Sequence, residues 1–87
     1  MAYVYILRCA DGSLYIGETD NLEARLLKHN DGTASAFTAR RRPVLLVYSE
    51  MHNRRAAAQA RERQLKRWTR AKKEALISGD LVLLKRL

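Results

Sequence analysis

The sequence predicts an α+β domain, with a three-stranded, mostly antiparallel sheet flanked by helices in the order β-β-α-β-α-α. Two runs of aromatic and β-branched residues, 3–8 and 14–17, flank the turn dipeptide Asp11-Gly12 and predict an N-terminal hairpin. A third apolar run of strand length lies at 44–48. Because stretches of helical character separate and follow these runs, a sheet with helices packed against it is the economical arrangement.

The register of the hairpin decides which face of the sheet carries Tyr15, and the sequence leaves two registers open. A two-residue turn at 11–12 pairs Tyr15 with Arg8, on the face away from Tyr5. A three-residue loop at 11–13 pairs Tyr15 with the residue after Arg8, on the face of Tyr5. A shared role for the two tyrosines therefore requires the second register or an equivalent bulge.

A first helix is predicted after the hairpin. Asp20 is the expected N-cap, and Glu23, three residues on, completes a capping-box pattern. The sequence Asn30-Asp31-Gly32 is expected to end the helix. Three side chains fall on one side of it: Leu22, Leu26 and His29. Arg25 and His29, four residues apart, project together at the rim of this core-facing stripe.

The remaining chain is predicted to hold one strand and further helices. Residues 33–43, with Thr, Ser, three consecutive arginines and Pro, indicate a loop. The run 44–48 (VLLVY) is expected to be the buried strand of the sheet. The alanine- and arginine-rich stretch from about 53 to 67 favours a strong helix. A second short helix is expected at 71–78, ended by Gly79, with one or two helical turns in the tail.

Composition bounds the class of protein and its partners. With 87 residues, the chain 1–87 is expected to form a single small domain in which recognition and chemistry share one surface. It carries 17 Lys and Arg against 9 Asp and Glu, a net charge of +8, which indicates a polyanionic partner. No apolar run approaches the about 20 residues that span a bilayer, and the N-terminus lacks the pattern of a secretory signal. We therefore expect a soluble, cytoplasmic protein that binds no membrane.

An ordered set of sequence elements resembles the GIY-YIG nuclease family. Tyr3-Val4-Tyr5 and, after nine intervening residues, Tyr15-Ile16-Gly17 look like the paired GIY and YIG elements. Residues 21–30 are similar to the family's first helix, and 62–68 to its later acidic helix. Two further segments fit the small bacterial single-domain branch related to the structure-specific endonuclease subunits: 42–48 and Lys72-Lys73. The resemblance covers nearly the whole chain and implies the GIY-YIG fold.

The resemblance also implies a one-metal phosphodiesterase, acting as an endonuclease. In that role Tyr5 would activate or orient the attacking water, with support from Tyr15. Arg25 would steady the scissile phosphate, assisted by His29. Glu62 would bind one divalent ion, Mg²⁺ or Mn²⁺. Relatives often carry a basic residue, an aromatic residue and a threonine before the loop arginines, and here residues 36–39 keep the ring without the flanking charge.

Each implied role has physical support. A fixed guanidinium and a divalent ion both stabilise the negative charge that develops on the phosphoryl oxygens during hydrolysis. Mg²⁺ uses one or two carboxylates together with substrate oxygens and waters, so Glu62 alone suffices. A tyrosine with a pKa of about 10 is a poor base near neutral pH unless cations lower that pKa. The many cations of this chain are expected to do so for Tyr5.

Plain structural interpretations stand beside these roles. The strand tyrosines are ordinary core residues on this view. Arg25 extends along the rim of the core, and His29 is a partly buried residue at a helix end. Glu62 pairs with Lys66 across one helical turn, which contributes about 0.2–0.5 kcal/mol on an exposed helix.

A basic surface is expected to track the phosphates of a nucleic acid. Its candidate members are Arg40, Arg41, Arg42, Lys66, Arg67, Lys72 and Lys73. Gly17 is expected to have a structural role, through close backbone approach or an unusual φ before the helix.

The leading functional hypothesis is a metal-dependent endonuclease acting on DNA, with branched or damaged structures as candidate substrates. The alternative is a non-catalytic nucleic-acid-binding module on the same scaffold, for which RNA is also a candidate ligand. A third hypothesis is an adaptor whose basic helix docks an acidic protein. A protein partner that supplies recognition is a further candidate. Glu62 favours catalysis, because a carboxylate repels phosphate and serves no purpose in a pure binding module.

Overall fold

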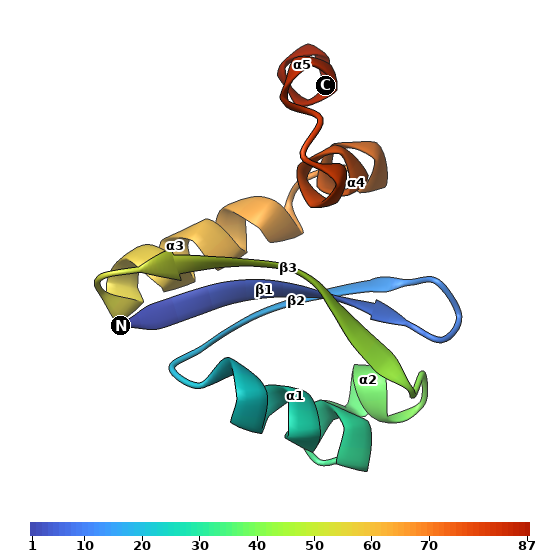
Figure 1. Cartoon of the computed structure of the whole chain (residues 1–87). Coiled ribbons are helices and arrows are strands. Elements are labelled where there is room, and N and C mark those ends of the chain that lie inside the picture. Colours follow the sequence, from blue (N-terminus) through green and yellow to red (C-terminus); the bar gives the residue numbers. More distant parts are fainter.

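The computed structural model describes residues 1–87 and contains one three-stranded antiparallel sheet with helices on both faces (Figure 1). The strands are β1 (Ala2–Cys9), β2 (Leu14–Thr19) and β3 (Val44–His52). The order across the sheet is β2-β1-β3, so β1 is the central strand. The predicted fold class, an α+β arrangement with an antiparallel sheet, is confirmed.

Five helices cover the two faces of the sheet. They are α1 (Leu22–Asp31), α2 (Ala36–Ala39), α3 (Arg55–Lys66), α4 (Arg70–Ser78) and α5 (Leu81–Arg86). Helices α1 and α2 lie on one face, and α3 with the two C-terminal helices lies on the other (Figure 1). No helix is both long enough and apolar enough to cross a lipid bilayer.

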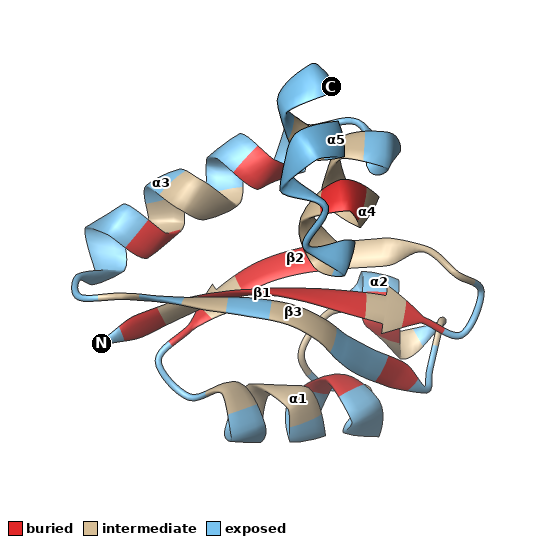
Figure 2. Ribbon diagram, turned by 45° about the horizontal axis from the view of Figure 1, so that its top comes forward, coloured by how far each residue is buried: buried red, intermediate tan, exposed pale blue.

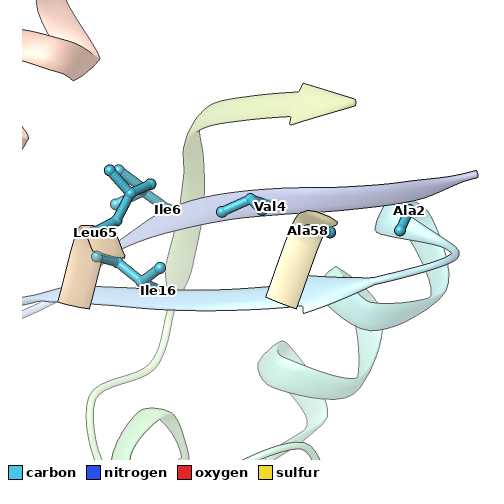
Figure 3. Packing of buried hydrophobic residues seen from close by; sticks show 6 residues of the cluster. All are labelled: Ala2, Val4, Ile6, Ile16, Ala58 and Leu65. Atoms are coloured by element: carbon cyan, nitrogen blue, oxygen red, sulfur yellow. The ribbon is translucent and has the colours of Figure 1, made fainter. Parts of the chain in front are cut away.

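Two apolar clusters hold these layers together, because successive side chains of β1 point to opposite faces. The even-numbered side chains Val4 and Ile6 pack against Ala58 and Leu65 of α3, as Figure 3 shows from close by. The odd-numbered side chains Tyr5, Leu7 and Cys9 form the second cluster on the α1 side, together with Val44 of β3. Burial is concentrated on β1, whereas α5 is almost wholly exposed (Figure 2).

The hairpin uses a register that differs from both predicted alternatives. Tyr15 pairs with Leu7, and the loop consists of residues 10–12, one residue earlier than expected. Gly12 has a φ of +86°, the left-handed conformation that commonly closes a three-residue hairpin loop. Because the pairing is shifted by an even number of residues from the second alternative, Tyr15 still lies on the same face as Tyr5.

The first helix begins one residue later than predicted. Its N-cap is Asn21, not Asp20, and the Asn21 side chain accepts a hydrogen bond from the Ala24 N–H at 3.0 Å. The Asn21 N–H donates a hydrogen bond to the Thr19 hydroxyl at 3.1 Å. In a capping box a glutamate side chain would accept from this N–H, so here the glutamate is not needed. The predicted end is confirmed, with Gly32 in the left-handed conformation at the C-cap.

Two further predictions about the middle of the chain are wrong. The segment 33–43 is not entirely a loop, because Ser35 caps the short helix α2 by accepting from the Phe37 N–H at 3.1 Å. The apolar run 44–48 is not the buried strand, because β3 is an edge strand and Leu45 is 65% exposed. Strand order depends on which strand gains two neighbours, and hydrophobicity alone does not report it.

Candidate active site

Tyr5 occupies the centre of a polar cluster on the α1 face of the sheet. Its ring is buried, and it extends from β1 across the neighbouring edge strand β2. There it lies over the backbone of Gly17, the residue paired with Tyr5, where an added Cβ would come within 2.5 Å of the Tyr5 Cζ. A side chain at position 17 would therefore displace the phenol.

His29, on the last turn of α1, is only 1% exposed and links Tyr5 to α2. The Tyr5 Oη and the His29 Nε2 are 2.9 Å apart, and the His29 Nδ1 lies 2.7 Å from the Thr38 Oγ1. The Thr38 hydroxyl donates to the Ser35 carbonyl at 3.4 Å. Because the only proton of the Thr38 hydroxyl is used in that bond, the hydroxyl oxygen accepts a hydrogen bond from Nδ1–H of His29. The Nε2 of the neutral imidazole then carries no proton and accepts a hydrogen bond from the Tyr5 O–H.

The charge states of this pair follow from its burial. Burial raises the pKa of the Tyr5 phenol to about 12, and the nearby Tyr15 and Glu62 also raise it, while Arg25 lowers it. Burial lowers the pKa of the His29 imidazole, and the Arg25 charge lowers it further. Both groups are therefore neutral at neutral pH. The expectation that cations would lower the Tyr5 pKa is wrong, because burial outweighs the single guanidinium beside it.

Arg25 projects from the middle of α1 toward the Tyr5 ring. Its guanidinium is close enough to both Tyr5 and His29 to lower their pKa values. None of the ion pairs of the chain involves Arg25: these involve Arg8, Arg41, Arg55, Arg61, Lys66, Arg70 and His52. A half-buried guanidinium without a carboxylate partner is suited to receive an external anion.

Glu62 comes from the opposite layer. Ala58, Glu62 and Leu65 lie on one stripe of α3, which faces the sheet. The Glu62 carboxylate is 20% exposed and forms an ion pair with Lys66 at 3.4 Å. Although α3 and α1 lie on different faces, the Glu62 charge raises the Tyr5 pKa, so the carboxylate is within electrostatic range of the phenol. The Tyr5 phenol lies over Gly17 of β2, and the neighbouring Ile16 of the same strand packs against α3.

The residues present fit a divalent ion held by one carboxylate. No group of three or more His, Cys, Asp or Glu side chains is arranged to hold a metal, so no preformed cage exists. Mg²⁺ characteristically keeps several waters and uses one or two carboxylates together with substrate phosphates. Glu62, mostly buried and paired with a single lysine, meets that requirement.

With this geometry in place, the comparisons with known proteins decide the family. A model of the GIY-YIG catalytic domain matches residues 1–75. The chain belongs to the GIY-YIG family. This is a family of nucleases, and the resemblance predicted from the sequence is confirmed.

The relatives of this GIY-YIG chain include small bacterial proteins. A UPF0213 protein of Staphylococcus saprophyticus is 47% identical over 76 residues, covering 87% of this chain and 93% of that protein. A UPF0213 protein of Clostridium perfringens is 50% identical over 82 residues, covering 94% and 88%. The solution NMR structure of a UPF0213 protein from Bacillus halodurans matches with a TM-score of 0.58 and 39% identity, covering 90% of this chain and 84% of that one.

The cations predicted to track phosphates have different surroundings in this GIY-YIG domain. Lys66 and Lys73 line a pocket beside Tyr15, whereas Arg67 and Arg40 are simply exposed. The Lys72 ammonium lies 4.5 Å from the centre of the Trp68 ring.

Two of the three loop arginines are engaged within the chain. The Arg41 Nε donates to Asp11 at 3.1 Å, and its NH1 donates to the Phe37 carbonyl at 2.8 Å. The Arg42 Nε donates to the Ala39 carbonyl at 3.0 Å. These two side chains therefore brace the loop before β3.

Thr38 and Phe37 contact the site although the sequence predicted no role for either residue. Thr38 is fully buried and bonds to His29, and the Phe37 ring lies 6.0 Å from the Tyr15 ring. The aromatic residue and the threonine in the segment 36–39 could have pointed to these contacts. The sequence predicted a loop there, however, and a loop does not indicate which way the two side chains point.

Proposed function

We propose that this chain is a metal-dependent endonuclease that hydrolyses phosphodiester bonds in DNA, with branched or damaged structures as candidate substrates. The observation that carries the proposal is the buried hydrogen bond between Tyr5 and His29, beside the unpaired guanidinium of Arg25. Membership of the GIY-YIG family supports the same reaction class.

The resting charge states suggest how the attacking water is activated. A Tyr5 phenol with a pKa of about 12 is neutral, so it accepts the proton of a water only as it releases its own. The neutral Nε2 of His29, 2.9 Å away, is placed to take that proton. Thr38 holds the opposite proton on Nδ1, which keeps Nε2 free. Tyr5 and His29 therefore act as one base in this proposal.

The phosphate is held by charge. Arg25 offers a guanidinium that has no carboxylate partner, beside the phenol that orients the water. Glu62 would hold Mg²⁺ or Mn²⁺, and such an ion, when bound, stabilises negative charge on the phosphoryl and leaving oxygens. Tyr15 packs edge-on against His29, with ring centres 5.0 Å apart, and so keeps the imidazole in position.

Cleavage of labelled single-stranded, duplex and branched DNA, with Mn²⁺ or with EDTA, tests the proposal. We expect Arg25→Ala and Glu62→Ala each to lower the rate of Mn²⁺-dependent cleavage by about 10²-fold or more. Each substitution removes a charge that stabilises the transition state. DNA affinity should change little, and it should rise slightly for Glu62→Ala because a carboxylate that repels phosphate is removed.

Matched controls are available on the same fold. Glu23→Ala and Arg86→Ala remove exposed charges on α1 and α5 and should cleave at the wild-type rate. Equal cleavage by the wild type and by both active-site variants would mean that a contaminant cuts the DNA, and the nuclease proposal would be withdrawn.

A non-catalytic nucleic-acid-binding module is the second candidate. The net charge of +8 is the observation that favours it, because a basic surface binds nucleic acid whether or not the site turns over. On this view the protein binds DNA or RNA tightly in EDTA, and Mn²⁺ produces no cleavage of any labelled substrate. A protein partner that supplies recognition is then the next component to seek.

A further inference from the structure

A pocket of about 220 Å³ opens at the β2 edge, next to the candidate active site. It is lined by Leu14, Tyr15, Ile16, Phe37, Lys66 and Lys73. Its volume is below the about 300–1000 Å³ of sites that take drug-sized ligands, so it suits a single ring system. The lining combines two aromatic rings from the α1 side with two lysines from the α3 side of the sheet.

The aromatic wall of this pocket belongs to a continuous row of planar groups. Tyr15 lies 5.0 Å from the His29 ring on one side and 6.0 Å from the Phe37 ring on the other, measured between ring centres. The row ends with the Arg41 guanidinium, 3.8 Å from the centre of the Phe37 ring. The row therefore leads from the buried His29 imidazole to the surface of the protein.

Phe37 is both exposed and held in place. It is 37% exposed although it is a large apolar ring, and it stands on the first turn of the capped helix α2. Arg41, which lies against one face of the ring, is fixed by Asp11 at 3.1 Å and by the Phe37 carbonyl at 2.8 Å. A ring that is already immobile loses little conformational freedom when a flat ligand stacks on it.

The opposite wall supplies positive charge at short range. Lys73 has no ion pair, and the ion pair of Lys66 with Glu62 is partly exposed to solvent. Aromatic rings beside lysines are the combination that binds bases and phosphates of single strands, because bases stack on the rings while phosphates contact the cations. In a duplex, both faces of each base are already stacked on neighbouring bases, so only an unpaired base can enter such a pocket.

We propose that this pocket binds one unpaired nucleobase of a single-stranded segment, stacked on Phe37, with Lys66 and Lys73 holding the flanking phosphates. This inference deepens the proposed function, on which it rests for its substrate class. If the pocket binds such a base, the protein recognises unpaired nucleotides beside the scissile phosphate.

The experiment compares two ligands of equal charge and length in EDTA, where no cleavage occurs. One is a fluorescein-labelled single-stranded oligothymidylate, and the other is the same backbone with every base replaced by an abasic unit. Fluorescence anisotropy should show that the wild type binds the oligothymidylate about tenfold more tightly, because stacking of one base on an aromatic ring is worth about that factor.

The variants identify the ring responsible. Phe37→Ala should bind both ligands with nearly equal affinity, and Phe37→Trp should keep the preference for bases. Leu27→Ala, which removes an exposed apolar side chain on the far side of α1, is the matched control and should behave as the wild type. The fully paired duplex should bind with an affinity that does not depend on Phe37.

Two results would overturn the inference: equal binding of both ligands by the wild type, or an unchanged preference in Phe37→Ala. Both are independent of turnover. If the wild type prefers bases through Phe37 but cleaves nothing with Mn²⁺, the base pocket stands and the nuclease proposal fails. If the protein cleaves DNA but shows no preference for bases, the nuclease proposal stands and the base pocket fails.

Discussion

At the scale of single residues, the proposed water activation depends on a buried pair of neutral groups, Tyr5 and His29. Each has a pKa moved away from neutrality by burial, upward for the phenol and downward for the imidazole. Neither is a strong base or acid alone, but their hydrogen bond allows a proton to pass from one to the other. Thr38 decides the direction of that bond by fixing the imidazole tautomer.

Replacing Thr38 tests this tautomer directly. Thr38→Val removes the acceptor of the Nδ1 proton, so we expect His29 to populate the Nε2-protonated form, which cannot accept from Tyr5. Long-range ¹H–¹⁵N NMR of the imidazole should report protonated Nδ1 in the wild type and in Thr38→Ser, and a mixture in Thr38→Val. Cleavage should fall about 10²-fold in Thr38→Val alone. An unchanged imidazole spectrum in Thr38→Val would refute the positioning role.

The Tyr5 pKa predicts loss of stability at high pH. The folded-state value of about 12 is above the unfolded value of 10.0, so the stabilisation is complete below pH 10 and is lost as pH rises through 12. A shift of this size corresponds to about 2–3 kcal/mol of unfolding free energy. Absorbance at 295 nm should show two of the four tyrosines titrating near pH 12, Tyr5 and Tyr48. Tyr5→Phe should remove one of these late steps, and two late steps remaining in Tyr5→Phe would contradict the assignment.

At the scale of elements, an ion-pair network attaches α4 to the hairpin. Arg8 on β1 donates to both carboxylate oxygens of Glu74, at 2.9 and 2.7 Å. Arg70 bonds to the same carboxylate at 3.2 Å and to the Gly12 carbonyl at 2.6 Å. This network orients Lys73, which follows on the same helix and lines the base pocket.

Glu74→Gln should loosen α4 without unfolding the protein. Both Arg8 and Glu74 are about one-third exposed, so solvent screens the pair and the loss should not exceed about 1 kcal/mol. Hydrogen exchange should accelerate at the amides of 70–78 and stay unchanged in α3. Glu23→Gln, an exposed carboxylate without an ion pair, is the control. Equal acceleration in α3 and α4 would mean that the network supports the whole sheet, contrary to this account.

The predictability of the fold differs from element to element. The hairpin, the first helix and α3 could be predicted because turn residues, capping residues and helical composition are local signals. The position of β3 at the edge and the register of the hairpin could not, because each depends on which partner a strand finds. The same limit applies to the candidate site. Arg25 and His29 are neighbours by helical spacing, whereas the proximity of Glu62 to Tyr5 depends on packing across the sheet.

At the scale of the whole molecule, the proposal requires the two layers to act on one phosphate. Tyr5, His29 and Arg25 come from the α1 side, and Glu62 from the α3 side. The Tyr5 phenol lies over Gly17 of the edge strand β2, which leaves room for it because it has no side chain. The base pocket spans the same edge, with Phe37 and Tyr15 on one side and the lysines on the other.

Paramagnetic broadening by Mn²⁺ tests this convergence most directly. With substoichiometric Mn²⁺, ¹H–¹⁵N NMR of the wild type should show the strongest broadening at amides around Glu62 on α3, around Gly17 on β2 and around Arg25 on α1. Glu62→Ala should abolish this pattern, and Glu23→Ala should preserve it. Broadening that centres on other carboxylates, or that persists in Glu62→Ala, would contradict a single metal and phosphate site at the β2 edge.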